Sequence, residues 1–206
     1  ELFSATLKPR EERRLLRGHL WAYRNEFEHL PEMPDGAVVD VFTSERRFVG
    51  RGFFQRDGGI AARLLSRRQE PIDAAFFRRR FDAARALREG LFSGQTAYRW
   101  IFGESDGLPG LVLDRYGALA VLHTSCAFYA QWLPTLAEML LETQDLRGVI
   151  SHAPGGAQSF GDVPDEIQFD LEGLRLAFAP KQTQKTGLFL DQRFINKSHG
   201  IERFPA

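Results

Sequence analysis

Short runs of alternating hydrophobic and polar residues follow one another along positions 5–68, and this period-two pattern is typical of β-strands. Between the last three runs lie turn formers of the hairpin type, at 43–47 and at 55–59. Pro9 favours the first turn of a short, mostly charged helix that ends near Arg17. Several short strands with one short helix indicate a small β-barrel. The predicted strands cover residues 5–8, 21–27, 37–42, 48–54 and 60–65.

The apolar spacing becomes helical after Pro71 and Asp73, which start a predicted linking helix. Apolar side chains fall on one face of this helix, and arginines fall on the opposite side. A solvated face is the usual explanation for such a run of charges. The alternative is an arginine ridge that lengthens a track for phosphates. The apolar residues are Phe77, Phe81, Ala84, Leu87 and Leu91, and the arginines are Arg78, Arg79, Arg80, Arg85 and Arg88.

A second module follows, in which three strands precede an amphipathic helix over 127–143. Pro134 suggests that the regular part of this helix begins near that residue. Residues 153–166 are rich in Gly and Pro and are predicted to form a loop. This order of elements indicates an α+β sandwich and not an alternating β-α repeat. The predicted strands cover residues 98–103, 111–116, 118–124, 147–152, 167–170 and 175–178.

The composition is that of an ordinary globular protein, with 43% hydrophobic and 26% charged residues among 206. No apolar run approaches the roughly 18–20 residues that a membrane span needs, so we expect no membrane association and a cytoplasmic protein. A single cysteine, Cys126, excludes an internal disulfide framework. Cys126 is either a buried inert thiol, which is the usual case in such a setting, or a nucleophile.

The charges are unevenly distributed, because residues 1–90 carry 18 Lys or Arg against 14 Asp or Glu. Of the 27 cations in the chain, 23 are arginine, which favours bidentate contact with phosphate and stacking on bases. A GC-rich genome gives the same enrichment. The five histidines show no metal-ligand spacing, so no metal site is predicted. Glu104, Asp106, Asp114 and Arg115 form a charged set around a turn, and nothing shows them converging on a reacting atom. They are interpreted as groups that cap the turn and dock against a further domain.

Residues 184–193 contain a glycine, an alternating apolar run and a polar cluster. If 187–190 is extended, Phe189 and Asp191 share one side of a strand, where they could contact a heterocycle and its polar groups. The alternative is an edge strand that ends in a solvated charge cluster.

The residues Arg17-Gly18-His19-Leu20-Trp21-Ala22-Tyr23-Arg24, followed by Gly36-Ala37-Val38-Val39-Asp40-Val41, resemble a PUA domain, a small RNA-binding barrel. Members of that family usually have proline where this chain has Leu20. Trp21 is assigned to the core, and core packing is also the alternative for His19. The resemblance implies an RNA-facing surface that includes Arg17, His19, Arg24 and Arg51. If the arginine ridge extends this surface, Arg78, Arg79 and Arg80 belong to it as well.

Three blocks together resemble bacterial S-adenosylmethionine-dependent methyltransferases that carry a PUA domain and make 5-methylcytosine in large-subunit ribosomal RNA. The blocks are the PUA-like opening, residues 99–117 and residues 184–193. In that family a Rossmann-like domain binds the cofactor and supplies the catalytic cysteines, so Cys126 does not match the nucleophile. The departure of Phe194-Ile195-Asn196-Lys197 from the family's pattern leaves Asn196 without a role. The resemblance implies that this chain contributes to the S-adenosylmethionine pocket through Thr186, Gly187, Phe189, Asp191 and Arg193. The alternative for Asp191 and Arg193 is that they pair with each other or hold the following helix.

The expected fold class is therefore α+β, with a PUA-like barrel at 1–68, a linking helix at 69–92 and a central α+β domain at 93–180. Residues 181–206 are expected to start a methyltransferase domain whose remainder is absent, which would make the chain a fragment. We expect ribosomal RNA as partner, with a homodimer as a further candidate. We expect no catalytic activity and no bound S-adenosylmethionine for this chain alone.

Two other functions are weighed against this one. The first is a stand-alone RNA-binding or adaptor protein without catalytic activity. The second is a small hydrolase that uses some of the carboxylates, for which no supporting constellation of residues is found.

Overall fold

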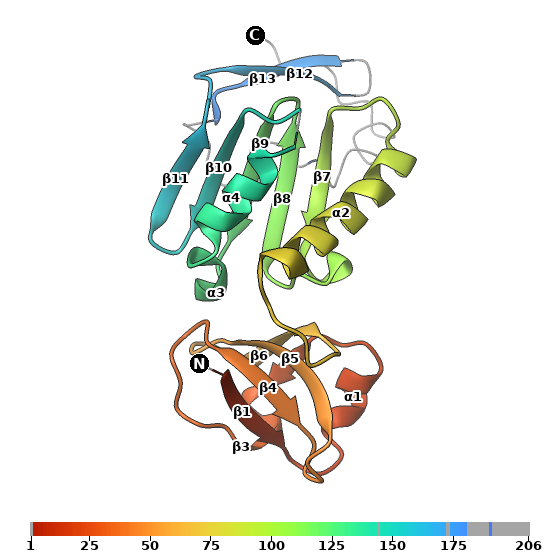
Figure 1. Ribbon diagram of the computed structural model, residues 1–206, viewed down its shortest axis with the longest axis vertical. Coiled ribbons are helices and arrows are strands. Elements are labelled where there is room, and N and C mark those ends of the chain that lie inside the picture. The colour runs from red at the N-terminus through yellow and green to blue at the C-terminus, as the bar shows by residue number, and fades with distance from the viewer. Residues whose placement is uncertain (1, 144, 172–173, 181–189, 191–206) are drawn as a thin grey trace.

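The computed structural model describes residues 2–143, 145–171, 174–180 and 190. The fold is α+β, as predicted, with a curled sheet in the N-terminal part and a second, helix-covered sheet after it (Figure 1). A separate two-stranded hairpin lies at the end of the second sheet that is remote from the first (Figure 1).

The first sheet is built from six strands in the order β2-β6-β5-β4-β1-β3. β1 and β4 are parallel, and the other neighbouring strands are antiparallel. Small and branched side chains, among them Ala5, Leu7, Val39, Val41 and Leu64, fill the inside of the curl. The elements are β1 (Leu2–Leu7), α1 (Glu12–Leu16), β2 (Trp21–Tyr23), η1 (Arg24–Glu26), β3 (Phe27–His29), β4 (Val38–Phe42), β5 (Phe48–Phe54) and β6 (Ile60–Ser66).

The predicted strand over 21–27 is wrong in one respect, because a 3₁₀ turn at η1 divides it. The buried carboxylate of Glu26 accepts hydrogen bonds from the backbone N–H of Tyr23 at 2.7 Å and from the Arg14 guanidinium at 2.7 Å. These two bonds hold the chain in a turn, so that β2 pairs with β6 and β3 pairs with β1. Helix α1 is also shorter than predicted, since Arg10 has a positive φ of 75°.

The second sheet has five strands in the order β11-β10-β9-β8-β7, and only the β9–β10 pair among them is parallel. Its helices cover one face (Figure 1). The elements are α2 (Ala74–Leu91), β7 (Ala97–Phe102), η2 (Gly103–Asp106), β8 (Leu111–Tyr116), β9 (Leu119–Thr124), α3 (Ala127–Ala130), α4 (Leu133–Leu141), β10 (Gly148–Ala153) and β11 (Gly156–Gly161). The separate hairpin consists of β12 (Ile167–Leu171) and β13 (Leu174–Phe178).

Three details of this part differ from the predictions. Residues 153–166 contain strand β11, and the predicted helix over 127–143 is two helices with a break at 131–132. In α2 the buried side chains include Phe77, Phe81 and Ala84, whereas Leu87 and Leu91 are 55% and 65% exposed. The last turns of α2 extend beyond β7, the edge strand of the second sheet (Figure 1).

The two sheets are joined by a continuous apolar cluster at a contact that we call the seam. The rings of Phe53, on β5, and Phe128, on α3, are stacked with centroids 4.5 Å apart. Gly36 lies so close to α3 that an added Cβ would be 2.7 Å from the backbone nitrogen of Phe128. Helix α2, predicted as a link, packs on the second sheet, where Phe81 contacts Trp100. The predicted domain boundaries remain predictions.

Candidate nucleic-acid interface

Strand β2 is an edge strand of the first sheet and carries two aromatic residues. Ala22 is fully buried, while Trp21 and Tyr23 on either side of it are half-buried. An arginine lies over each ring, with Arg63 5.3 Å from the Trp21 centroid and Arg14 4.7 Å from the Tyr23 centroid. Aromatic rings and planar guanidinium groups are the side chains on which unstacked bases stack. This edge therefore has the chemistry of a surface that contacts RNA bases.

The loop between α1 and β2 carries two of the predicted RNA-binding residues, Arg17 and His19, and both are exposed. The Nδ1 atom of His19 accepts from the Arg14 guanidinium at 2.9 Å and from the Trp21 backbone N–H at 3.2 Å. Because arginine only donates, the ring proton of this histidine is placed on Nε2. The His19 carbonyl accepts from Arg67 at 2.8 Å, which ties the loop to the end of β6. Burial lowers the pKa of Arg67 below its ordinary value.

The other two predicted RNA-binding residues of the barrel hold the sheet together. Arg24 is exposed and donates to the carbonyls of Gln55 and Arg56 at 2.9 and 2.6 Å. Arg51 makes a bidentate pair with Asp40 at 2.7 and 2.9 Å, and its side chain is only 14% exposed. The hydrogen bond with Asp40 raises the pKa of Arg51 above its ordinary value. RNA binding by Arg51 would require this pair with Asp40 to open, and it remains a prediction.

The three arginines of the predicted ridge have three different partners. Arg78 pairs with Glu142 at 2.6 Å, Arg79 pairs with Glu70 at 2.7 Å, and Arg80 donates to the Leu65 carbonyl at 3.0 Å. Successive residues of an α-helix are rotated by about 100°, which explains why three consecutive side chains diverge. RNA binding by these residues remains a prediction.

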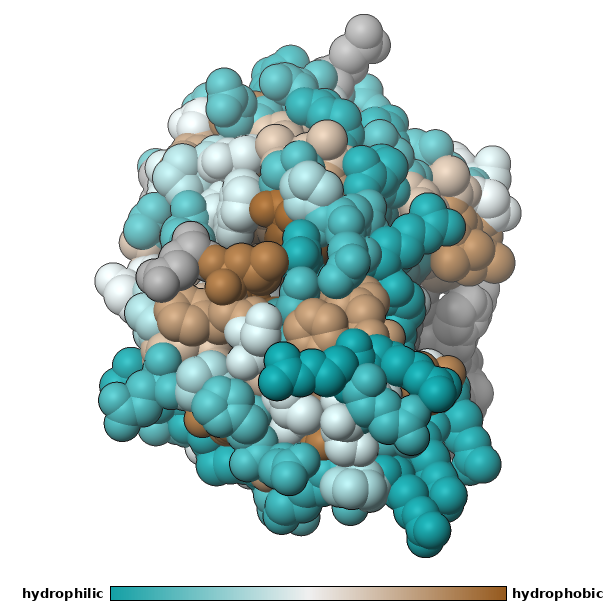
Figure 2. Space-filling view, turned by 60° about the horizontal axis from the view of Figure 1, so that its bottom comes forward, coloured by the Kyte–Doolittle hydropathy of each residue, from teal (hydrophilic) through white to brown (hydrophobic). Residues whose placement is uncertain are grey.

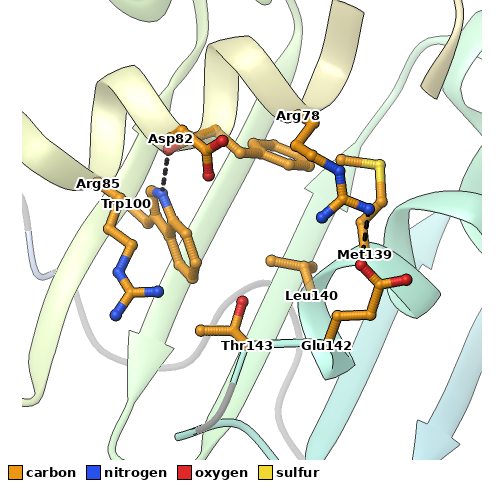
Figure 3. A pocket seen from close by; sticks show the side chains of 9 residues that line it. Arg78, Asp82, Arg85, Trp100, Met139, Leu140, Glu142 and Thr143 are labelled. Carbon is orange, nitrogen blue, oxygen red and sulfur yellow. Dashed lines mark hydrogen bonds and ion pairs between the residues drawn. The ribbon is translucent and has the colours of Figure 1, made fainter. Parts of the chain in front are cut away.

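A hollow of about 300 Å³ lies between α2 and α4. Figure 3 shows Arg78 pointing to Glu142 at one end of it and Arg85 beside Trp100 at the other. Asp82 also lines this hollow, so two carboxylates balance its two arginines. The balance of charge makes the hollow a weak candidate for binding a polyanion.

The carboxylates around η2 are each paired with arginine. Asp106 makes a bidentate pair with Arg88, and Asp114 makes one with Arg99. Glu104 accepts from the Trp21 indole at 2.7 Å and from Arg63 at 3.2 Å. These contacts link elements and do not converge on a site where an acid and a base could act together.

Cys126 is buried, and burial raises the pKa of its thiol above the ordinary value. The protonated thiol is a poor nucleophile. Across the described ranges, no group of three or more His, Cys, Asp or Glu is placed to hold a metal ion. The same residues include no helix with the length and apolarity needed to cross a bilayer. The predicted cofactor-binding residues Thr186, Gly187, Phe189, Asp191 and Arg193 lie outside the described residues.

Comparison with known proteins now adds to this geometry. Residues 5–67 match the family of PUA-like domains. The chain is 34% identical, over 91% of its length, to the ribosomal RNA large subunit methyltransferase I of Shewanella denitrificans, and 32% identical over the same share to that of Pseudoalteromonas atlantica. The chain is homologous to these large-subunit ribosomal RNA methyltransferases. It spans about half the length of the curated relatives it matches, 51% in both cases.

Two solved structures share the fold. One is described as a SAM-dependent methyltransferase from Streptococcus mutans, with a TM-score of 0.81 and 18% identity, over 95% of this chain and 53% of that chain. The other is described as a methyltransferase complexed with SAH and has a TM-score of 0.84, with the same identity and coverage. At this low identity the likeness shows a common fold over nearly all of the chain.

Sequence reasoning missed Trp21, which it assigned to the core. Ala22 is recognised as the buried residue of β2 only in the structure, where Trp21 and Tyr23 on either side of it are half-buried.

Proposed function

We propose that this chain is the RNA-recognition and positioning portion of a SAM-dependent ribosomal RNA methyltransferase that acts on C5 of cytosine. The observation that carries the proposal is the 34% identity over 91% of the chain to a large-subunit ribosomal RNA methyltransferase. The PUA-like barrel supports it, since its edge strand presents aromatic and arginine side chains suited to RNA.

In this proposal, the residues that carry out methyl transfer lie in a part of the protein outside the described residues. The carboxylates of η2 and β8 are held by arginines, and Cys126 is a buried thiol with a raised pKa. S-adenosylmethionine would be held with help from Thr186, Gly187, Phe189, Asp191 and Arg193, in a methyltransferase domain that begins near residue 181. The chain alone would then be inactive and would act, as part of the whole enzyme, on ribosomal RNA in the cytoplasm.

The proposed RNA contact is a surface that we call the β2 edge surface. Its exposed cations, Arg17 and Arg24, would contact phosphates, which give RNA binding its strength and its salt dependence. Its aromatic rings would contact bases. The surface consists of Arg14, Arg17, His19, Trp21, Tyr23, Arg24 and Arg63.

The proposal predicts that removing two exposed cations of this surface weakens RNA binding. The double change Arg17→Gln and Arg24→Gln is expected to raise the Kd for a large-subunit ribosomal RNA fragment about 10-fold at roughly 0.1 M salt. The slope of log Kd against log salt concentration is expected to fall by about 2, one for each lost phosphate contact. Fluorescence anisotropy over a series of salt concentrations measures both quantities.

Two comparison variants locate the effect. Arg147 and Arg175 are exposed arginines of the second part of the chain, and changing both to Gln removes the same charge. Their loss should leave the affinity within about 2-fold, because the β2 edge surface is intact. If this control weakens binding as much as the Arg17 and Arg24 pair does, the binding is not localised and the proposed surface is wrong. If RNA affinity falls only after the triple change of Arg78, Arg79 and Arg80, the interface lies on α2 and not on the β2 edge surface.

A further inference from the structure

The β2 edge surface is tied to the second part of the chain at one polar contact of the seam. The indole N–H of Trp21 and the guanidinium of Arg63 both donate to Oε1 of Glu104, the second residue of η2. The Arg63 side chain is only 14% exposed, so its position over the Trp21 ring is fixed. The side chain of Glu104 is 41% exposed, which places this contact at the surface.

A second aromatic ring lies on the other side of this contact. Phe102 is the last residue of β7 and is 46% exposed. The other large hydrophobic residues that are exposed in the described part of the chain are leucines. The Arg99 guanidinium lies 5.3 Å from the Phe102 ring centroid and is held there by Asp114 at 2.8 and 3.0 Å. The Phe102 backbone N–H donates to Asp106 at 2.6 Å, which fixes the end of the strand.

Glu104 is therefore close to both aromatic residues, because it accepts from the Trp21 indole and follows Phe102 by two positions in the chain. Phe102 and Glu104 are two positions apart in the chain, so their Cα atoms lie at most about 7 Å from each other. Each ring has an arginine over it, and each arginine is anchored by a carboxylate. This repeated pairing of ring, guanidinium and carboxylate holds each ring in place near Glu104.

We propose that Trp21 and Phe102 form a stacking platform on which unpaired nucleotides of RNA lie across the seam. The inference rests on the proposed function and adds the class of RNA that the chain takes, which is a single-stranded loop or bulge. Bases in a duplex stack on one another, so only bases that are splayed out can lie on a protein ring. Any base can stack on an aromatic ring, because every base has a π-face.

The charges favour bases over phosphates at this point of the surface. Glu104 carries a negative charge between the two rings and repels the phosphate backbone at short range. Its carboxylate can accept a hydrogen bond from a base amino group. Cations are provided to one side by the α1–β2 loop, where Arg17 is exposed. The phosphates would follow that loop while the bases turn toward the platform.

A pair of changes at Phe102 separates stacking from simple apolar contact. Phe102→Leu keeps an apolar side chain but removes the π-face, and Phe102→Tyr keeps the ring. We expect Phe102→Leu to weaken binding of a fluorescein-labelled single-stranded oligoadenylate of about 12 nucleotides by roughly 5- to 100-fold. Phe102→Tyr should bind that oligonucleotide within about 2-fold of the unchanged chain, and a self-complementary RNA duplex of similar length should bind all three proteins alike.

The same series distinguishes failure of the platform from failure of the proposed function. If the unchanged chain binds RNA and Phe102→Leu binds the single strand equally well, the platform is wrong and the proposed function stands. An equal loss for single strand and duplex also overturns the platform, because stacking would not weaken duplex binding. If the unchanged chain binds neither RNA, both proposals fall together. Thermal unfolding of each variant checks that the substitution at the exposed residue Phe102 leaves the fold intact.

Discussion

Replacing Phe128 with alanine is expected to lower the free energy of unfolding by about 3–5 kcal/mol, the usual range for a large aromatic residue in a core. Phe128 is fully buried and stacks on Phe53 of the barrel at 4.5 Å. It also contacts the rings of Phe77 and Tyr129 in the second part of the chain. Its loss opens a cavity at the seam and removes the ring contacts that join the two parts there.

Urea denaturation followed by circular dichroism measures this loss. Because the seam joins the two sheets, Phe128→Ala is also expected to separate the unfolding of the barrel from that of the second sheet. The denaturation curve would then show two transitions in place of one. Phe102→Ala is the matched control, because this ring is 46% exposed, and its loss should change the unfolding free energy by less than about 1 kcal/mol. Equal losses for the two variants would show that the seam does not hold the two parts together.

Gly52→Ala is expected to destabilise the barrel by about 3 kcal/mol or more, through overpacking against backbone. A Cβ at Gly52 would clash with the carbonyl group of Arg63, whose carbon would lie 2.7 Å away. Both residues belong to paired strands, β5 and β6, so the obstacle is a fixed backbone and not a flexible side chain. Relief of the clash requires the β5–β6 ladder to open.

Gly90→Ala is the control for this change, since it makes the same chemical substitution in helix α2, where nothing lies within 4 Å of the added methyl group. It should stabilise the protein by about 0.5–1 kcal/mol, because alanine is the better helix former. Denaturation midpoints of the two variants should therefore move in opposite directions. A Gly52→Ala protein with unchanged stability would contradict the close β5–β6 packing.

The elements that sequence predicted correctly are those with a strong local signal. The start of α2 is one, and it is confirmed by the Asp73 carboxylate, which accepts from the Phe76 backbone N–H at 2.8 Å. The strands around the two hairpin turns of the barrel are another, because the turn formers at 43–47 and 55–59 mark where β4, β5 and β6 end and begin. Capping groups and turn formers act within a few residues, so they can be recognised without the tertiary structure.

Elements defined by distant partners could not be predicted in this way. Strand β11 is exposed along most of its length and pairs with β10 through backbone bonds, so its Gly-rich sequence carries no alternation to detect. The 3₁₀ turn η1 depends on Glu26 reaching Arg14, twelve residues away.

The candidate site shows the same limit. Arg17 and Arg51 look equally available in the sequence, but Asp40 lies opposite Arg51 on the neighbouring strand and occupies its guanidinium. Trp21 gains its place at the surface from Glu104, a residue of the second part of the chain. Such partners are known only when the two sheets have been placed together.

Photo-cross-linking with a large-subunit ribosomal RNA fragment that contains 4-thiouridine is the most direct test of the proposed RNA-recognition role. The chain is irradiated with the RNA, digested, and its RNA-bearing peptides are identified by mass spectrometry. We predict adducts in residues 17–24, on the β2 edge surface, and around Phe102. Efficient cross-linking with no adduct in either segment, or no cross-linking at low salt, would contradict the account.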